Sequence, residues 1–161
     1  MKKKWIVAFV FLAAAAAAAV FLVTRNGSAP KKEVLPLADA AKKAFADFDQ
    51  LTEYDGEELY DIVGVAPDDY TEFVYRTGEN GIGLVAREII LVRAKDSDAV
   101  KRIAGALAHY RERRQTETRT YAPDIFAMIE KSAVSVKNLT AALIISGDSA
   151  KETTSFLSGE Q

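Results

Sequence analysis

Hydrophobic residues follow three different patterns along this chain. Residues 5–23 form an unbroken apolar run that comes after three lysines. Residues 24–33 are polar and contain glycine, serine and proline, which is typical of a short linker. Beyond them, short apolar stretches alternate with polar turns, and we find no internal repeat or second linker. The pattern therefore predicts a basic tail (1–4), an apolar segment (5–23), a linker (24–33) and one folded domain (34–161).

The apolar segment is long enough to cross a bilayer. A membrane-spanning helix needs roughly 20 apolar residues, with ~17 as the lower limit, and Trp5 to Val23 comprises 19. The lysines at positions 2–4 precede the segment, so the positive-inside rule places the N-terminus in the cytoplasm. We therefore expect a single-pass anchor that holds the C-terminal domain outside the cell.

A cleaved signal peptide is the alternative interpretation of the same segment. Residues 5–12 could form its hydrophobic region, and the alanine tract 13–19 offers small residues for cleavage. Cleavage would release a secreted domain, whereas retention gives a membrane-tethered one. Both interpretations export the domain.

Periodicity in the first part of the domain predicts two helices and a hairpin. Residues 37–51 have apolar positions at helical spacing, and a shorter helix at 57–63 could end at the following glycine. Residues 70–76 are aromatic and β-branched, which favours a strand. A glycine-rich loop at 77–83 then leads into a longer predicted strand at 84–94.

The second part of the domain contains further helices and a second hairpin. Asp96 is a candidate N-cap for a long helix that runs to about Arg114, and Pro123 is placed to start the next helix. Strands at 134–136 and 139–145 would flank a turn at Lys137-Asn138, and a last helix is expected at 149–157.

Strands that arrive in adjacent pairs predict an antiparallel sheet. We therefore expect an α+β fold: a two-layer domain in which helices pack on a mainly antiparallel sheet of about four strands. The run from Ile89 to Val92 is apolar on both faces, which is typical of a central strand.

Composition excludes several classes of function. The chain has no cysteine, which excludes a disulfide framework, a thiol nucleophile and zinc–thiolate sites. Asp and Glu (23) outnumber Lys and Arg (21), so the charge does not favour nucleic-acid binding. His109 is the single histidine and has no ligand partner at metal-binding spacing. We expect no metal and no cofactor.

Charged residues inside apolar elements are the candidates for a binding site. Arg87 and Glu88 occupy opposite faces of the strand at 84–94, because side chains alternate along a strand. The simpler interpretation pairs Glu88 with an arginine of the following helix, and the alternative is a binding cleft at the seam between sheet and helix. The candidate ligand-binding residues are Arg87, Glu88, Arg111, Arg114 and Tyr121.

A series of short motifs resembles a known family. The motifs are Leu59-Tyr60-Asp61-Ile62-Val63-Gly64-Val65, Arg87-Glu88-Ile89, Tyr110-Arg111-Glu112-Arg113, Tyr121-Ala122-Pro123, Val134-Ser135-Val136-Lys137-Asn138 and Ser146-Gly147-Asp148. In this order they resemble domain-of-unknown-function family 4358, found in small exported proteins of Gram-positive anaerobes. The resemblance covers most of residues 35–157.

The resemblance implies an extracytoplasmic location and a lipoprotein or membrane-tethered form. It implies no activity and no catalytic residues. This chain cannot be a lipoprotein because it lacks the cysteine that would carry the lipid. The apolar segment at 5–23 therefore becomes the expected tether.

Three functional hypotheses follow. The leading one is a non-catalytic, membrane-tethered extracytoplasmic domain that binds a protein or a cell-wall component. The second is an exported anion or small-ligand receptor centred on Arg87 and the arginine-rich helix. The third is a cell-envelope hydrolase that would use carboxylate pairs such as Asp68-Asp69 and Glu57-Glu58. The sequence leaves the identity of the partner and the oligomeric state open.

Overall fold

A computed structural model describes residues 34–159. The chain divides into two units, residues 1–33 and 34–161, and only the second contains described residues. The predicted tail, apolar segment and linker fall outside the described residues, so anchor and signal peptide both stay predictions. Among residues 34–159, no helix combines the length and the apolar character needed to cross a membrane.

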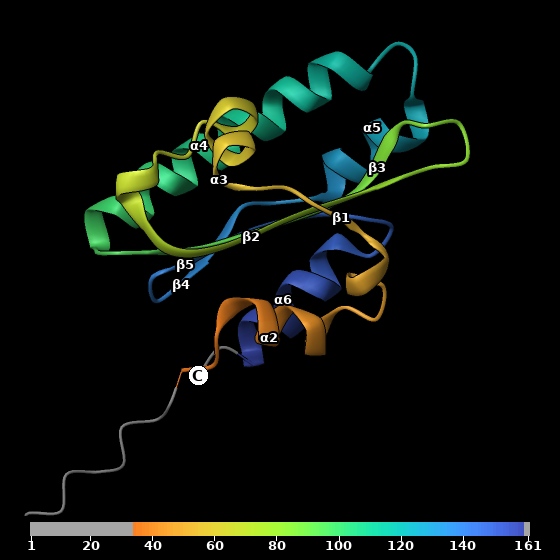
Figure 1. Cartoon of the computed structure of the whole chain (residues 1–161). Coiled ribbons are helices and arrows are strands. Elements are labelled where there is room, and N and C mark those ends of the chain that lie inside the picture. Colours follow the sequence, from red (N-terminus) through yellow and green to blue (C-terminus); the bar gives the residue numbers. More distant parts are fainter. Residues whose placement is uncertain (1–33, 160–161) are drawn as a thin grey trace, which may run out of the picture. The chain divides into compact units, whose positions relative to one another are not determined.

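The domain is built on one antiparallel sheet in the order β1-β2-β3-β5-β4 (Figure 1). Its strands are β1 (Thr52–Glu53), β2 (Tyr70–Glu79), β3 (Val85–Ala94), β4 (Ser135–Lys137) and β5 (Thr140–Ile145). The predicted α+β class and antiparallel pairing are confirmed. The sheet has five strands rather than about four, because a two-residue edge strand has too few residues to show a periodic pattern.

Helices cover both faces of the sheet, so the domain has three layers rather than the predicted two. On one face lie α3 (Gly56–Glu58) with the π-helical turn Leu59–Val63, α4 (Ser97–Thr118) and α5 (Pro123–Lys131). On the other lie α2 (Leu37–Ala44) and α6 (Ser149–Gly159), as Figure 1 shows.

Alternate residues of the central strands supply the two hydrophobic cores. Ile90 and Val92 of β3 pack with the α4 side, and Ile89 and Leu91 pack with the α2 and α6 side. A strand that buries both of its faces has a continuous apolar sequence, as residues 89–92 do. The apolar run was therefore evidence for three layers.

Local signals place the element boundaries. Asp96 caps α4 by accepting hydrogen bonds from the backbone N–H groups of Asp98 (3.0 Å) and Ala99 (2.8 Å). Gly64 ends the preceding helical turn at φ +87°, and Asn138 turns the β4–β5 hairpin at φ +54°. These three predictions are confirmed.

Helix α2 is shorter than predicted. It ends at Ala44 because Phe45 adopts an extended backbone, and a short 3₁₀ turn (Phe48–Gln50) follows. Phe45 and Phe48 are nevertheless both buried. The helical spacing of apolar residues therefore extends beyond the end of the helix itself. Phe45 stacks against Phe156 of α6 with a centroid separation of 5.9 Å, which joins the two helices of this layer.

Candidate ligand-binding site: a tyrosine-lined pocket beside a buried carboxylate

Glu88 is completely buried between the sheet and α4. It lies on β3 directly opposite Thr77 of β2, and its side chain points toward α4. Helix α4 presents Tyr110 and Arg114 to it, which share one helix face because they are four residues apart. We call Glu88, Arg114, Tyr110 and Tyr75 the Glu88 network.

Both oxygens of the Glu88 carboxylate have donors. Oε1 accepts a hydrogen bond from Arg114 Nε at 3.0 Å, and Oε2 accepts a short one from the Tyr110 hydroxyl. The Tyr75 hydroxyl lies 3.4 Å from that of Tyr110 and donates to it, because the Tyr110 proton is directed at Glu88. A buried charge is tolerated only when it is paired and hydrogen-bonded in this way. The predicted pairing of Glu88 with a helix arginine is confirmed.

Arg114 has further partners around the same carboxylate. Its Nη2 donates to the backbone carbonyl of Val85 at 3.0 Å, and its Nη1 lies 3.6 Å from Glu117. Burial disfavours the charge of Arg114, but Glu88, Tyr110 and Glu117 together outweigh burial and raise the Arg114 pKa. Arg114 therefore stays charged.

Burial also fixes the protonation of the tyrosines. It raises the pKa of Tyr75 to about 12. Burial, followed by the negative charge of Glu88, raises the pKa of Tyr110 well above its ordinary value. Both hydroxyls therefore remain protonated near neutral pH and act as hydrogen-bonding groups rather than as bases.

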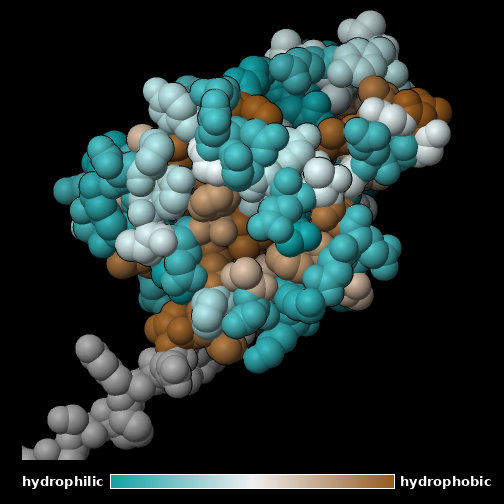
Figure 2. All heavy atoms as spheres, in the orientation of Figure 1, coloured by the Kyte–Doolittle hydropathy of each residue, from teal (hydrophilic) through white to brown (hydrophobic). Residues whose placement is uncertain are grey.

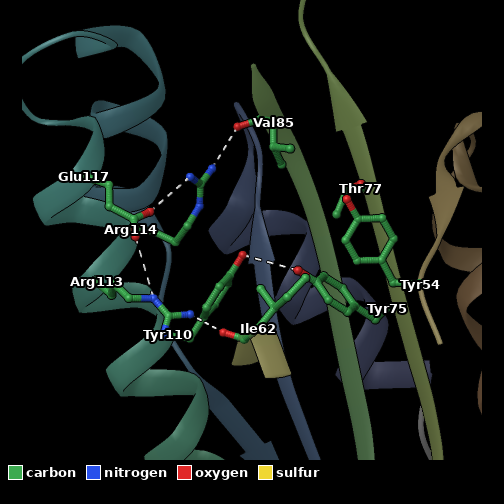
Figure 3. Close-up of a pocket in the computed structure, with 9 residues that line it drawn as sticks. All are labelled: Tyr54, Ile62, Tyr75, Thr77, Val85, Tyr110, Arg113, Arg114 and Glu117. Atoms are coloured by element: carbon green, nitrogen blue, oxygen red, sulfur yellow. Dashed lines mark hydrogen bonds and ion pairs between the residues drawn. The ribbon is translucent and has the colours of Figure 1, made fainter. Parts of the chain in front are cut away.

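A pocket of about 220 Å³ opens beside this network (Figure 3). Tyr110, Arg113 and Arg114 project from α4 toward the strand that carries Tyr75, as Figure 3 shows. The pocket is lined by Tyr54, Ile62, Tyr75, Thr77, Val85, Tyr110, Arg113, Arg114 and Glu117. We call it the α4 pocket.

The α4 pocket is lined by aromatic rings and by arginines whose charges are balanced by nearby carboxylates. The rings of Tyr54 and Tyr75 meet edge to face with centroids 4.7 Å apart. Arg113 donates a short hydrogen bond to the carbonyl of Ile62 and lies 3.8 Å from Glu117. Each arginine in the wall thus has a carboxylate neighbour, and tyrosine rings form much of the remaining wall.

Arg87 lies on the opposite face of the sheet from the Glu88 network. Its guanidinium donates to both oxygens of Asp47 (2.9 and 3.1 Å) and to Glu152 of α6 (2.5 Å). The hydrogen bond from Arg87 holds the pKa of Asp47 below its ordinary value. Arg87 borders a second pocket, of about 490 Å³, where its charge is already offset by two carboxylates.

The other two predicted site residues lie elsewhere. Arg111 donates to the backbone carbonyls of Ile129 (3.2 Å) and Glu130 (2.9 Å), so it caps the C-terminal end of α5. Tyr121 is exposed in the turn between α4 and α5 and does not line the α4 pocket. Of the five predicted residues, the structure brings together Glu88 and Arg114.

Sequence reasoning missed the tyrosines of the site. One signal was available, because Tyr110 precedes Arg114 by one helical turn and therefore faces the same strand. Tyr54 and Tyr75 reach the pocket through the pairing of distant segments, which local periodicity does not encode.

The acidic pairs considered for hydrolysis have structural partners. Glu58 forms a capping box with Asp55 at the start of α3. Asp69 accepts hydrogen bonds from Arg102 of α4, the shortest at 2.6 Å. Across the described part of the chain, no group of three or more His, Asp or Glu side chains is placed to hold a metal ion.

Comparison with known proteins identifies a family. No curated protein and no protein of solved structure matches the chain. A family model described as "Domain of unknown function" matches residues 44–146, more than half of the 161 residues. The matched region begins where α2 ends and stops before α6, so it contains the whole sheet, α4, α5 and every residue of the α4 pocket. The chain belongs to this family, the domain of unknown function DUF4358.

Proposed function

We propose that this protein is a membrane-tethered extracytoplasmic domain that binds a protein or a cell-wall component through the α4 pocket without transforming it. The tether is the apolar segment 5–23, whose length suits a single membrane span. The observation that carries the binding role is the α4 pocket itself, beside a buried and fully paired carboxylate.

The state of the polar groups supports binding rather than catalysis at this pocket. Glu88 is fully buried, both of its oxygens accept hydrogen bonds from Arg114 and Tyr110, and it does not line the pocket, so it is not placed to take a proton from a bound group. The pKa of Tyr75 is raised to about 12, so its hydroxyl does not serve as a base near neutral pH. The network instead holds the aromatic wall in one geometry, which lowers the cost of binding.

Pocket size favours one group of a larger partner over a complete small ligand. Small-molecule sites usually enclose roughly 300–1,000 Å³, and the α4 pocket encloses about 220 Å³. A single side chain or sugar unit would pack against the ring of Tyr54, which is partly exposed in the pocket. Because the arginines have carboxylate neighbours, we expect the bound group to be uncharged.

The alternative of an anion receptor at Arg87 has weaker support. Asp47 and Glu152 already neutralise that guanidinium. An incoming anion would have to displace both carboxylates, which costs the hydrogen bonds that they accept.

Site-directed photo-crosslinking in native membranes tests the proposal. A photoreactive phenylalanine analogue would replace Tyr54, which is partly exposed in the α4 pocket, in the full-length chain. The matched control replaces Tyr60, an exposed tyrosine that does not line the pocket. We expect a discrete protein or glycan adduct from position 54 that is absent from position 60. Equal labelling at the two positions, or none at either, would argue against a binding role for the pocket.

A substitution at the same position tests whether the crosslinked contact contributes to the affinity for the partner. Tyr54→Ala removes an aromatic wall, and truncation of an aromatic anchor commonly costs more than about 1 kcal/mol of binding free energy. We therefore expect roughly tenfold weaker capture of the identified partner, with circular dichroism unchanged. Undiminished capture would place the contact elsewhere.

A further inference from the structure

Apolar side chains are exposed at the end of the domain where the described chain begins. Val34 and Leu35 are 57% and 44% exposed, and Leu139 of the β4–β5 turn is 37% exposed. Figure 2 shows hydrophobic residues on the surface at this end of the domain, as well as elsewhere on the same face. We call Val34, Leu35 and Leu139, together with the exposed Lys95, the entry end.

A groove of about 370 Å³ runs through the entry end. Distant segments meet there: the first described residue, the start of β2, the end of β3 with the residue that follows it, and the β4–β5 turn. The lining residues are Val34, Thr71, Arg93, Ala94, Lys95, Asn138, Leu139 and Thr140. Exposed apolar side chains beside a groove commonly mark a contact surface.

Hydrogen bonds tie the backbone around Leu35 to the end of the sheet. Arg93 Nη2 donates to the carbonyl of Leu35 at 3.1 Å, and Arg93 Nη1 donates to Glu72 at 2.7 Å. Glu72 in turn accepts a hydrogen bond from the backbone N–H of Leu37 at 2.7 Å, which satisfies a donor of the first turn of α2. The backbone is thus tied to the end of the sheet while the side chains of Val34 and Leu35 stay exposed.

The position of the entry end along the chain indicates what covers it. Only residues 24–33 separate the apolar segment from Val34. Ten residues reach at most about 36 Å when fully extended. If residues 5–23 cross the membrane, the entry end is therefore the part of the domain with the shortest reach to the lipid surface.

Charge at the entry end matches an anionic lipid surface. Lys95 is exposed beside the groove, and the residues just before the domain are Lys31, Lys32 and the single acidic Glu33. Of the acidic side chains near the groove, Glu72 is paired with Arg93, and Asp96 accepts hydrogen bonds from the N-terminal N–H groups of α4. Basic residues near a bilayer are attracted by acidic phospholipids, and aliphatic side chains enter the headgroup boundary.

We propose that the entry end rests on the bilayer surface, with Val34, Leu35 and Leu139 in the headgroup region and Lys95 against acidic phospholipid. This inference depends on the membrane tether of the proposed function. The contact with lipid would fix which end of the domain faces the membrane.

Lipid quenching of site-specific probes tests the contact. The chain has no cysteine, so a single substitution gives a unique labelling site. The full-length protein would be reconstituted into vesicles of phosphatidylglycerol and phosphatidylcholine, with an environment-sensitive fluorophore attached at Leu139→Cys. Ile82→Cys is the matched control, because Ile82 is 80% exposed in the β2–β3 loop. We expect brominated lipid to quench the probe at position 139 and not the one at position 82.

Two charge and polarity variants define the interaction. Lys95→Gln should reduce the ratio of docked to undocked domain about fivefold in anionic vesicles. Each basic residue near an anionic membrane surface contributes favourably to the free energy of binding. Val34→Glu should remove the quenching at position 139 without changing the melting temperature, because Val34 is exposed.

A probe at Ala16→Cys separates failure of this inference from failure of the tether. Quenching at position 16 without quenching at 139 overturns the inference and leaves the tether standing. No quenching at either position overturns both. A probe at 139 that is shielded from water but not quenched by brominated lipid also overturns the inference, because a second copy or another protein then covers the entry end.

Discussion

Glu88 of β3 and Arg114 of α4 form an ion pair across the seam between sheet and helix, with 3.0 Å between Oε1 and Nε. Glu88 is fully buried and Arg114 largely so. Removal of one partner of such a pair leaves a buried charge without compensation, which typically costs about 3–5 kcal/mol. We expect Arg114→Met to lose that much free energy of unfolding, measured by urea denaturation at neutral pH.

A second substitution separates the effect of charge from that of packing. Glu88→Gln combined with Arg114→Met removes both charges and retains an acceptor for the Tyr110 hydroxyl. We expect the double variant to recover most of the lost stability. A double variant less stable than Arg114→Met alone would show that the loss arises from packing rather than from the uncompensated carboxylate.

Alkaline unfolding should depend on Tyr75. Its folded-state pKa is about 12, mainly because of burial, against an ordinary value of 10.0. A raised folded pKa contributes stability that is complete below about pH 10 and is lost as the pH rises toward about 12. Tyr75→Phe should therefore flatten the fall in stability over this range, measured by thermal melts at successive pH values. Tyr121→Phe, which alters an exposed ring, should leave the profile unchanged, and equal profiles for all three proteins would contradict the assignment.

Acid unfolding should depend on Asp47. The hydrogen bond from Arg87 lowers its pKa below the ordinary 3.8. A lowered folded pKa contributes stability that is present above this value and is lost as the pH falls below it. We expect Asp47→Asn to be less stable than the parent at neutral pH, with the difference shrinking below about pH 4. Asp61→Asn removes an exposed carboxylate and serves as the control; a shrinking difference there too would indicate a general charge effect.

Two glycines should respond to alanine with opposite signs. At Gly64 and at Gly105, an added methyl group would have no heavy atom within 4 Å beyond its local backbone, so neither substitution causes a clash. Gly64 has a φ of +87°, where alanine is strained by about 1–2 kcal/mol. Gly105 lies inside α4, where alanine is favoured by about 1 kcal/mol. Chemical denaturation of the two variants checks this, and a shift of the same sign in both would refute the conformational explanation.

Those features of the fold that depend on neighbouring residues in the chain could be predicted. The Asp96 cap, the Gly64 stop and the Asn138 turn each depend on a few neighbouring residues, so each could be inferred from the chain alone. The site was less predictable. The alternation of side chains correctly put Arg87 and Glu88 on opposite faces, but their partners come from distant parts of the chain.

Local patterns along the chain were enough to infer the α+β class, the antiparallel hairpins and the need of Glu88 for a basic partner. Tertiary structure decided that helices cover both faces of the sheet, that Arg87 pairs with Asp47 and Glu152, and that Tyr54 and Tyr75 meet α4 at one pocket. The physical reason is the range of each interaction. Backbone preference and side-chain alternation act over a few residues, whereas ion pairs and pockets form between surfaces that only the packing of the helices brings together.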